Sequence, residues 1–171
     1  KSLFGDADAN YCRVMEYNAA DFVPVMACPS QVDKIRNVSE LEGTEIDQVF
    51  IGSCTNGRLE DLAAAAEVLK GRQVAKFVKL IVTPASRKIY KQAADLGILE
   101  TLAEAGAMIT HPACGLCCGR AGGILTDGER VVATNNRNFL GRMGTSKVQI
   151  YLASPRTAAA CAVAGKIVCP E

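Results

Sequence analysis

The chain has 171 residues, the size of one ordinary domain or of one part of a larger enzyme. Apolar residues make up 49% of it and charged residues 22%, so a packed core is expected and disorder is not. A net charge of +1, an aromatic content of 5% and the absence of Trp argue against nucleic acid as a partner. No apolar run approaches the ~20 residues that a membrane helix needs, so no membrane partner is expected either.

Residues 1–171 are expected to form a single domain, in which residues 1–45 are an irregular first segment with short strands. Weak alternation of apolar and polar residues predicts such strands over residues 13–17 and 22–27. The chain starts at Lys1, with neither a starting Met nor the long apolar stretch of a signal peptide. We therefore expect it to be a part of a longer protein.

Beyond this segment the sequence predicts alternating strands and helices. Apolar runs indicate strands over residues 49–52, 79–82, 108–110, 130–133 and 149–153, with a last one over 167–168. Helices are predicted over residues 59–69, 86–96, 99–105 and 156–164, each followed by a glycine. The alternation indicates an α/β fold with a mainly parallel sheet flanked by helices. Ligands bind such sheets at the carboxyl ends of the strands.

The eight cysteines are many for a chain of this size. A chain this large can build a core without a disulfide framework, so a reducing compartment such as the cytoplasm is the better interpretation, with some thiols used as ligands. Four of the cysteines lie in segments without a chemical motif and are expected to be ordinary buried or half-buried thiols. These are Cys12, Cys28, Cys161 and Cys169.

Three other cysteines form the strongest signal in the sequence. Cys54 follows one predicted strand, and Cys114 and Cys117 follow another through a Cys- and Gly-rich loop that is expected to open a short helix. Residues three apart share one side of a helical turn, and adjacent strands lie only ~5 Å apart, so Cys54 could join the pair. Soft thiolates favour iron–sulfur clusters, zinc or copper(I). The simplest count is three thiolates and one open coordination position.

Spacing alone leaves alternatives open. Cys118 lies four residues from Cys114, so it shares the same helix face and can also serve as a ligand. A closed zinc site normally has four ligands, and the remaining candidates are Cys118 and the sole histidine, His111. A CxxC motif is also the redox motif of thioredoxin-like proteins. A non-enzymatic metal- or redox-responsive module is therefore the alternative from another functional class.

Three ordered segments resemble the signatures of the aconitase and isopropylmalate isomerase family. They are VFIGSCTNGR at residues 49–58, HPACGLC at 111–117 and NRNFLGRMG at 136–144. The segment YLASP at 151–155 and the Ala-rich stretch after it match the way the large subunits of the isomerases finish. The resemblance covers most of the chain from residue 22 onward.

The resemblance implies the C-terminal, cluster-binding domain of a large subunit, with three α/β/α layers. It implies a [4Fe–4S] cluster held by Cys54, Cys114 and Cys117. It also implies that Asn136, Arg137 and Arg142 line the substrate pocket. The arginines make chemical sense in their own right, because a planar guanidinium pairs well with carboxylates.

The activity implied is that of a hydro-lyase, which reversibly dehydrates and rehydrates a hydroxy di- or tricarboxylic acid. The foremost candidate is a 3-isopropylmalate dehydratase of leucine biosynthesis, and the alternatives are a homoaconitase or a dimethylmalate/citraconate-type hydratase. The GRAGG segment at residues 119–123 resembles these branches more than mitochondrial aconitase. Cys118 departs from the family pattern, in which an aliphatic residue is more usual after the last ligand.

The implied partners are a small-molecule hydroxy acid, the remaining domains of the large subunit and a small swivelling subunit. The sequence offers no convincing general base or acid, so we expect this chain alone to be catalytically silent.

Overall fold

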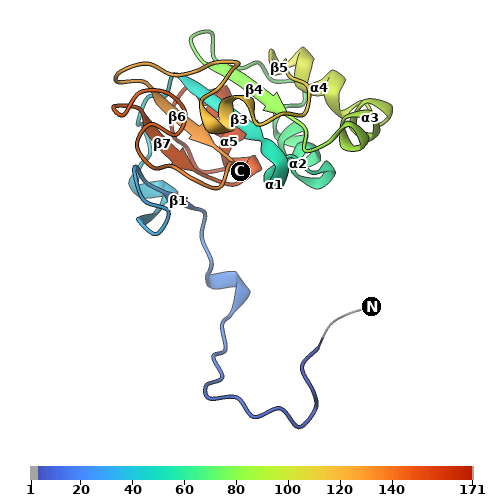
Figure 1. The fold of residues 1–171 in the computed structure, drawn as a ribbon, viewed down its shortest axis with the longest axis vertical. Helices are drawn as coiled ribbons and strands as arrows, with labels where there is room; N and C mark the ends of the chain where they lie inside the picture. Colours follow the sequence, from blue (N-terminus) through green and yellow to red (C-terminus); the bar gives the residue numbers. More distant parts are fainter. Residues whose placement is uncertain (1–3, 171) are drawn as a thin grey trace.

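The computed structural model describes residues 4–170, which are built around a seven-stranded sheet (Figure 1). The strands lie in the order β2-β1-β7-β6-β3-β4-β5. The five strands from β7 to β5 run parallel, and β1 and β2 add an antiparallel edge. This arrangement confirms the predicted α/β fold with a mainly parallel sheet. The strands are β1 (Val25–Ala27), β2 (Ile35–Asn37), β3 (Gln48–Gly52), β4 (Lys79–Thr83), β5 (Met108–Ile109), β6 (Arg130–Ala133) and β7 (Gln149–Leu152).

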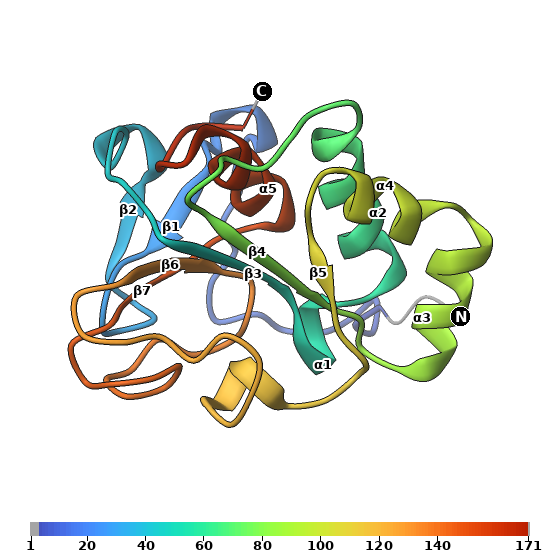
Figure 2. The same ribbon diagram turned by 90° about the horizontal axis from the view of Figure 1, so that it is seen from above.

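The helices gather on one face of the sheet and a long loop covers the other, which gives three layers (Figure 2). The loop layer consists of the segments between β5 and β7 and contains a 3-10 turn, η3 (Gly115–Cys118). The short helix α1 lies apart, at the carboxyl end of β3. The α-helices are α1 (Ser53–Asn56), α2 (Leu59–Leu69), α3 (Arg87–Asp95), α4 (Ile98–Glu104) and α5 (Pro155–Ala164). None of the helices within residues 4–170 has the length and apolarity needed to cross a membrane.

Local sequence signals explain where the longer helices begin and end. The Ser86 hydroxyl accepts a hydrogen bond from the Ile89 amide at 3.2 Å, and Ser154 accepts one from the Thr157 amide at 3.2 Å. These side chains satisfy amides that have no partner within the helix, at the starts of α3 and α5. Helix α5 ends at Gly165, which adopts the left-handed conformation that favours glycine.

Most predicted elements are confirmed to within one or two residues, and two are wrong. Residues 13–17 form no strand, because they lie in an extended, exposed arm with no neighbouring strand to pair with (Figure 1). Residues 167–168 form no strand either, and only Lys166 makes an isolated bridge, with Glu45. The strand predicted over 22–27 is limited to β1, and β2 was not predicted. Cys12, expected to be at least half-buried, is exposed because it lies in the arm.

The carboxyl end of β3 approaches β4 unusually closely. Gly52 has φ +127°, and a Cβ atom on it would lie 2.0 Å from the carbonyl oxygen of Thr83. The Gly52 amide donates a hydrogen bond to the Thr134 hydroxyl at 2.8 Å, from the loop after β6. Only glycine fits between these neighbours, and the chain that leaves β3 toward Cys54 is fixed as a result.

We predict that Gly52→Ala lowers the free energy of unfolding by about 3 kcal/mol or more, because it combines backbone strain with a collision against backbone atoms. The measurement is urea denaturation of the intact protein. Gly71→Ala is the control: Gly71 also has a positive φ, of +70°, but no atom lies within 4 Å of the added Cβ. The control should cost only about 1 kcal/mol. Equal losses in the two variants would contradict this account of Gly52.

Candidate functional site: a cavity lined by three cysteines

Cys54, Cys114 and Cys117 line the same cavity, of about 200 Å³. Cys54 lies in α1, directly after β3, and the other two lie in the loop that follows β5. The remaining walls are short or apolar residues, among them the buried Pro84. The cavity therefore presents thiols in largely apolar surroundings at the carboxyl end of the sheet, where ligands of such sheets bind.

The two cysteine-bearing strands are not adjacent, which corrects the expectation from the sequence. β4 lies between β3 and β5, so the two loops meet over the carboxyl end of β4. The residues that follow β4, Pro84 and Ala85, form part of the cavity wall. The thiols are brought together by loops that bend over a third strand, and not by direct strand pairing.

Ser53 is a cavity residue to which the sequence analysis assigned no role. Its side chain is 3% exposed, and it lines the cavity beside the three thiols. Its hydroxyl is buried without a hydrogen-bond partner, and its backbone has φ +83°. It is the only non-glycine residue within residues 4–170 with a positive φ. Its place between a glycine and a candidate ligand was the signal available in the sequence.

The other cysteines differ from these three in position. Cys118 is half-buried and does not line the cavity. Its thiol donates a hydrogen bond to the carbonyl oxygen of Gly115 at 3.5 Å. Cys161 is buried in α5, and burial raises the pKa of its thiol to about 11. A thiol with so high a pKa stays protonated at neutral pH and is a poor ligand. Cys54 and Cys114 are exposed and Cys117 is half-buried, as accessible ligands must be.

The predicted substrate-binding residues lie in the loop after β6, and two of them contact the cysteine-bearing segments. Asn136 donates a hydrogen bond to the Thr55 hydroxyl at 2.6 Å, next to Cys54. The Nε of Arg142 donates to the carbonyl oxygen of Cys117 at 2.5 Å, and its Nη2 lies 3.6 Å from the Cys117 Sγ. Arg137 is exposed and donates to the carbonyl oxygen of Asn136 at 2.9 Å.

The remaining asparagines of this loop are buried and have a structural role. The amide of Asn138 donates to the carbonyl oxygens of Cys28 and Gln31, at 2.7 and 3.2 Å. The Nδ2 of Asn135 lies 3.6 Å from the sulfur of Met143. These contacts fix the loop from inside, so that Asn136 and Arg137 are left at its surface.

His111 packs against an aromatic ring. Its imidazole stacks on the ring of Tyr90, with centroids 5.7 Å apart and an angle of 19° between the planes. It is exposed and does not line the cysteine cavity. His111 therefore has a packing contact at the start of the loop between β5 and β6, residues 110–129, which we call the cysteine loop.

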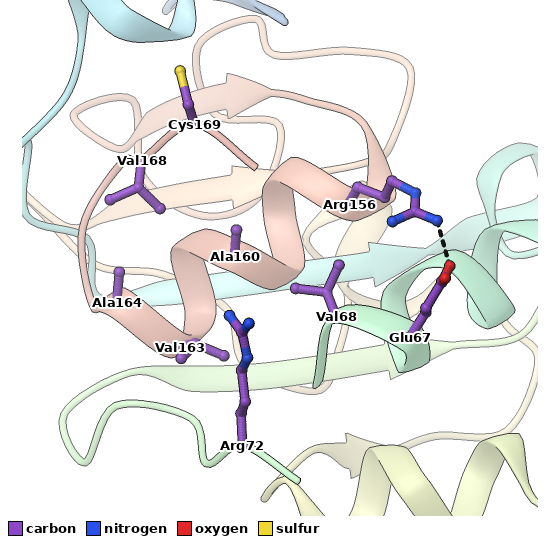
Figure 3. A pocket seen from close by; sticks show the side chains of 9 residues that line it. All are labelled: Glu67, Val68, Arg72, Arg156, Ala160, Val163, Ala164, Val168 and Cys169. Carbon is purple, nitrogen blue, oxygen red and sulfur yellow. Dashed lines mark hydrogen bonds and ion pairs between the residues drawn. The ribbon is translucent and has the colours of Figure 1, made fainter. Parts of the chain in front are cut away.

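A larger hollow of about 390 Å³ lies between α2 and α5, and Figure 3 shows its lining. Its walls are mainly Val and Ala side chains, and an ion pair between Arg156 and Glu67 crosses its rim. Cys169 lies at its edge. The groups with metal-binding chemistry are concentrated in the smaller cavity, which is therefore the candidate site.

The donor set in the cavity fits an iron–sulfur cluster. Within residues 4–170 no three His, Cys, Asp or Glu side chains lie close enough together to hold a single metal ion. A cubane cluster makes a different demand, because each thiolate binds a separate iron and the sulfurs stand around a volume. Three thiols around one cavity, with an unpartnered hydroxyl beside them, meet that demand.

Comparison with known proteins identifies the family. A profile of the aconitase family (aconitate hydratase) matches residues 30–165, which include every cavity-lining residue and the loop after β6. The chain belongs to the aconitase family. The match confirms the resemblance that the three sequence signatures carried.

Several curated relatives of this aconitase-family chain are about half identical to it. The large subunit 2 of 3-isopropylmalate dehydratase from Archaeoglobus fulgidus is 52% identical over 100% of the chain. The homoaconitase large subunit from Thermus thermophilus is 53% identical over 99% of it. The 3-isopropylmalate dehydratase large subunit from a Sulfurihydrogenibium species is 54% identical over 97% of it. The aligned parts make up 41%, 40% and 38% of these relatives, so the chain spans about two fifths of their length.

Asn136 and Thr55 lie 81 residues apart in the chain, and their hydrogen bond predicts energetic coupling between two signature segments. In a double-mutant cycle with Thr55→Val and Asn136→Ala, urea denaturation of the intact protein should give a coupling energy of about 1 kcal/mol. Additive effects of the two substitutions would show that the segments do not support each other through this bond.

Proposed function

We propose that this chain is the cluster-binding part of the large subunit of a hydro-lyase, and that its substrate is 3-isopropylmalate. A homoaconitase is the alternative, because a homoaconitase large subunit resembles the chain as closely as the dehydratase subunits do. The single observation that carries the proposal is the cavity, which is lined by all three cysteines of the family signatures.

Cys54, Cys114 and Cys117 would hold a [4Fe–4S] cluster in this cavity. With three thiolate ligands, such a cluster when bound supplies one open iron as a Lewis acid toward a hydroxyl and a carboxylate. The apolar walls formed by Pro84, Pro112 and their neighbours would limit the access of water to the sulfurs.

The arginines of the loop after β6 would bind the carboxylates of the substrate. Arg142 is half-buried, its guanidinium lies 5.4 Å from the ring centre of Phe139, and it is held by Cys117, so its orientation is restricted. Arg137 is exposed and can reach an anion at the surface of the loop. Arg142 lies against Cys117, and Arg137 lies five residues before it in the same loop. Two guanidinium groups suit a substrate with more than one carboxylate.

The proposal includes partners outside this chain. The relatives are named as large subunits, and the chain covers about two fifths of them, so the remaining large-subunit domains and a small subunit would complete the pocket. The groups that transfer protons would belong to those parts. Eight free thiols suit a reducing, cytoplasmic compartment.

Removing any one of the three proposed ligands should abolish cluster assembly. We predict that Cys54→Ala, Cys114→Ala and Cys117→Ala each leave the intact protein colourless after anaerobic reconstitution, with little bound iron or sulfide. The measurement is visible absorption together with iron and acid-labile sulfide assays.

Cys118→Ala is the matched control, because it removes a half-buried thiol from the same loop. It should retain the brown colour and the full iron and sulfide content. Zinc without sulfide in the unsubstituted protein would favour the non-enzymatic metal- or redox-responsive module instead. Loss of the cluster in Cys118→Ala together with its retention in Cys117→Ala would move the ligand to Cys118.

Arg137→Lys should lower kcat/KM for 3-isopropylmalate in the intact enzyme about ten-fold or more, because lysine keeps the charge but loses the bidentate fork. Its cluster content should not change. Arg36→Lys is the control, since Arg36 lies on the edge strand β2 in an exposed ion pair with Glu40. An unchanged kcat/KM in Arg137→Lys would remove Arg137 from the substrate site.

A further inference from the structure

Ser53 is one of the residues that line the cysteine cavity, and it carries a buried hydroxyl group without a hydrogen-bond partner. The side chain is 3% exposed, and its Oγ makes no hydrogen bond to any described residue. Burying a hydroxyl without a partner destabilises the folded protein, and an apolar residue of the same size would avoid this cost. The Ser53 hydroxyl would therefore be stabilised by a hydrogen-bond acceptor on a bound ligand.

The backbone at Ser53 is held in a conformation that is unusual for a residue with a side chain. Ser53 has φ +83°, in a region that glycine favours. It follows Gly52, whose backbone lies in close contact with the backbone of Thr83. Strain of this kind persists only where neighbours enforce it, and it concentrates at sites that clamp a ligand. The same backbone bend positions Cys54, so that Ser53 and Cys54 line the same cavity.

The surroundings limit what the hydroxyl can bond. The cavity wall offers the thiols of Cys54, Cys114 and Cys117, and its other side chains are Pro and Ala. A ligand bound by these thiols would bring sulfur atoms, which accept hydrogen bonds and carry negative charge.

We propose that the Ser53 hydroxyl donates a hydrogen bond to a sulfur of the cluster bound in this cavity, and thereby stabilises the more reduced cluster. Hydrogen bonds to the sulfurs help to set the reduction potential of such clusters, because they compensate the negative charge gained on reduction. This inference rests on the proposed function and assigns a role to a residue outside the three ligands and the substrate loop.

The test compares Ser53→Ala with the unsubstituted intact protein, after anaerobic reconstitution of both. The variant should assemble a cluster with a lower midpoint potential, and it should lose that cluster in air about ten-fold faster, since a hydrogen bond to a charged acceptor is removed. Without a cluster, the same variant should unfold at an equal or higher temperature, because an unpartnered buried hydroxyl has been removed. A purely structural serine would give the opposite result in the cluster-free protein.

Two further variants separate the hydroxyl from other effects. Ser53→Gly also lacks the hydroxyl but relieves the backbone strain, so it should share the lowered potential of Ser53→Ala. Ser154→Ala removes the cap of α5, far along the chain from the cavity loops, and should lower the unfolding temperature with and without the cluster while the potential stays unchanged.

An unchanged potential and an unchanged rate of cluster loss in Ser53→Ala would overturn the inference. So would a lowered potential in Ser53→Gly alone, because the backbone and not the hydroxyl would then be responsible. Failure of the unsubstituted protein to bind iron and sulfide would instead refute the proposed function.

Discussion

Gly52 ends β3, the middle one of the five parallel strands, so close to Thr83 of β4 that no side chain fits between them. Its amide is tied at the same time to Thr134, in the loop after β6. These two contacts hold the carboxyl ends of β3, β4 and β6 together. They also fix the backbone that leaves β3 and continues through the strained Ser53 to Cys54. The cysteine cavity depends on these contacts, because they fix Cys54 at a point that the loop after β5 can reach over the end of β4.

The cysteine loop has few regular hydrogen bonds of its own and is held by side chains from elsewhere. Arg142 donates to the carbonyl oxygen of Cys117, and Gln48, in the buried strand β3, donates to the carbonyl oxygen of Gly123. Asn136 makes the corresponding link to Thr55 on the other loop. Residues proposed to bind the substrate thus also support the segments proposed to bind the cluster. Loss of activity on substitution of Arg142 would for this reason combine two effects, whereas the hydrogen bond of Arg137 is made within its own loop.

The sequence predicted the sheet and the longer helices, and it singled out the three cysteines that line one cavity. Each of these depends on local signals such as apolar runs, helix caps and ordered motifs. The order of the strands could not be read from these signals. Nothing local to Cys54 or Cys114 indicates that β4 lies between their strands. The unpartnered hydroxyl of Ser53 could not be predicted either, because Ser53 is brought into one cavity with residues that follow β4 and β5 and lie far from it in the sequence. The strand predicted over residues 13–17 failed for a related reason: alternation predicts a strand only where another strand is available to pair with it.

We propose that one cavity at the end of the sheet holds iron through three thiolates. The most direct measurement is diffraction at the iron absorption edge from crystals of the intact protein prepared without oxygen. We expect a compact group of iron atoms inside the cavity bounded by Cys54, Cys114 and Cys117, with one iron that no side chain of this chain ligates. Iron located elsewhere, or a single ion bound by four side chains, would contradict the account.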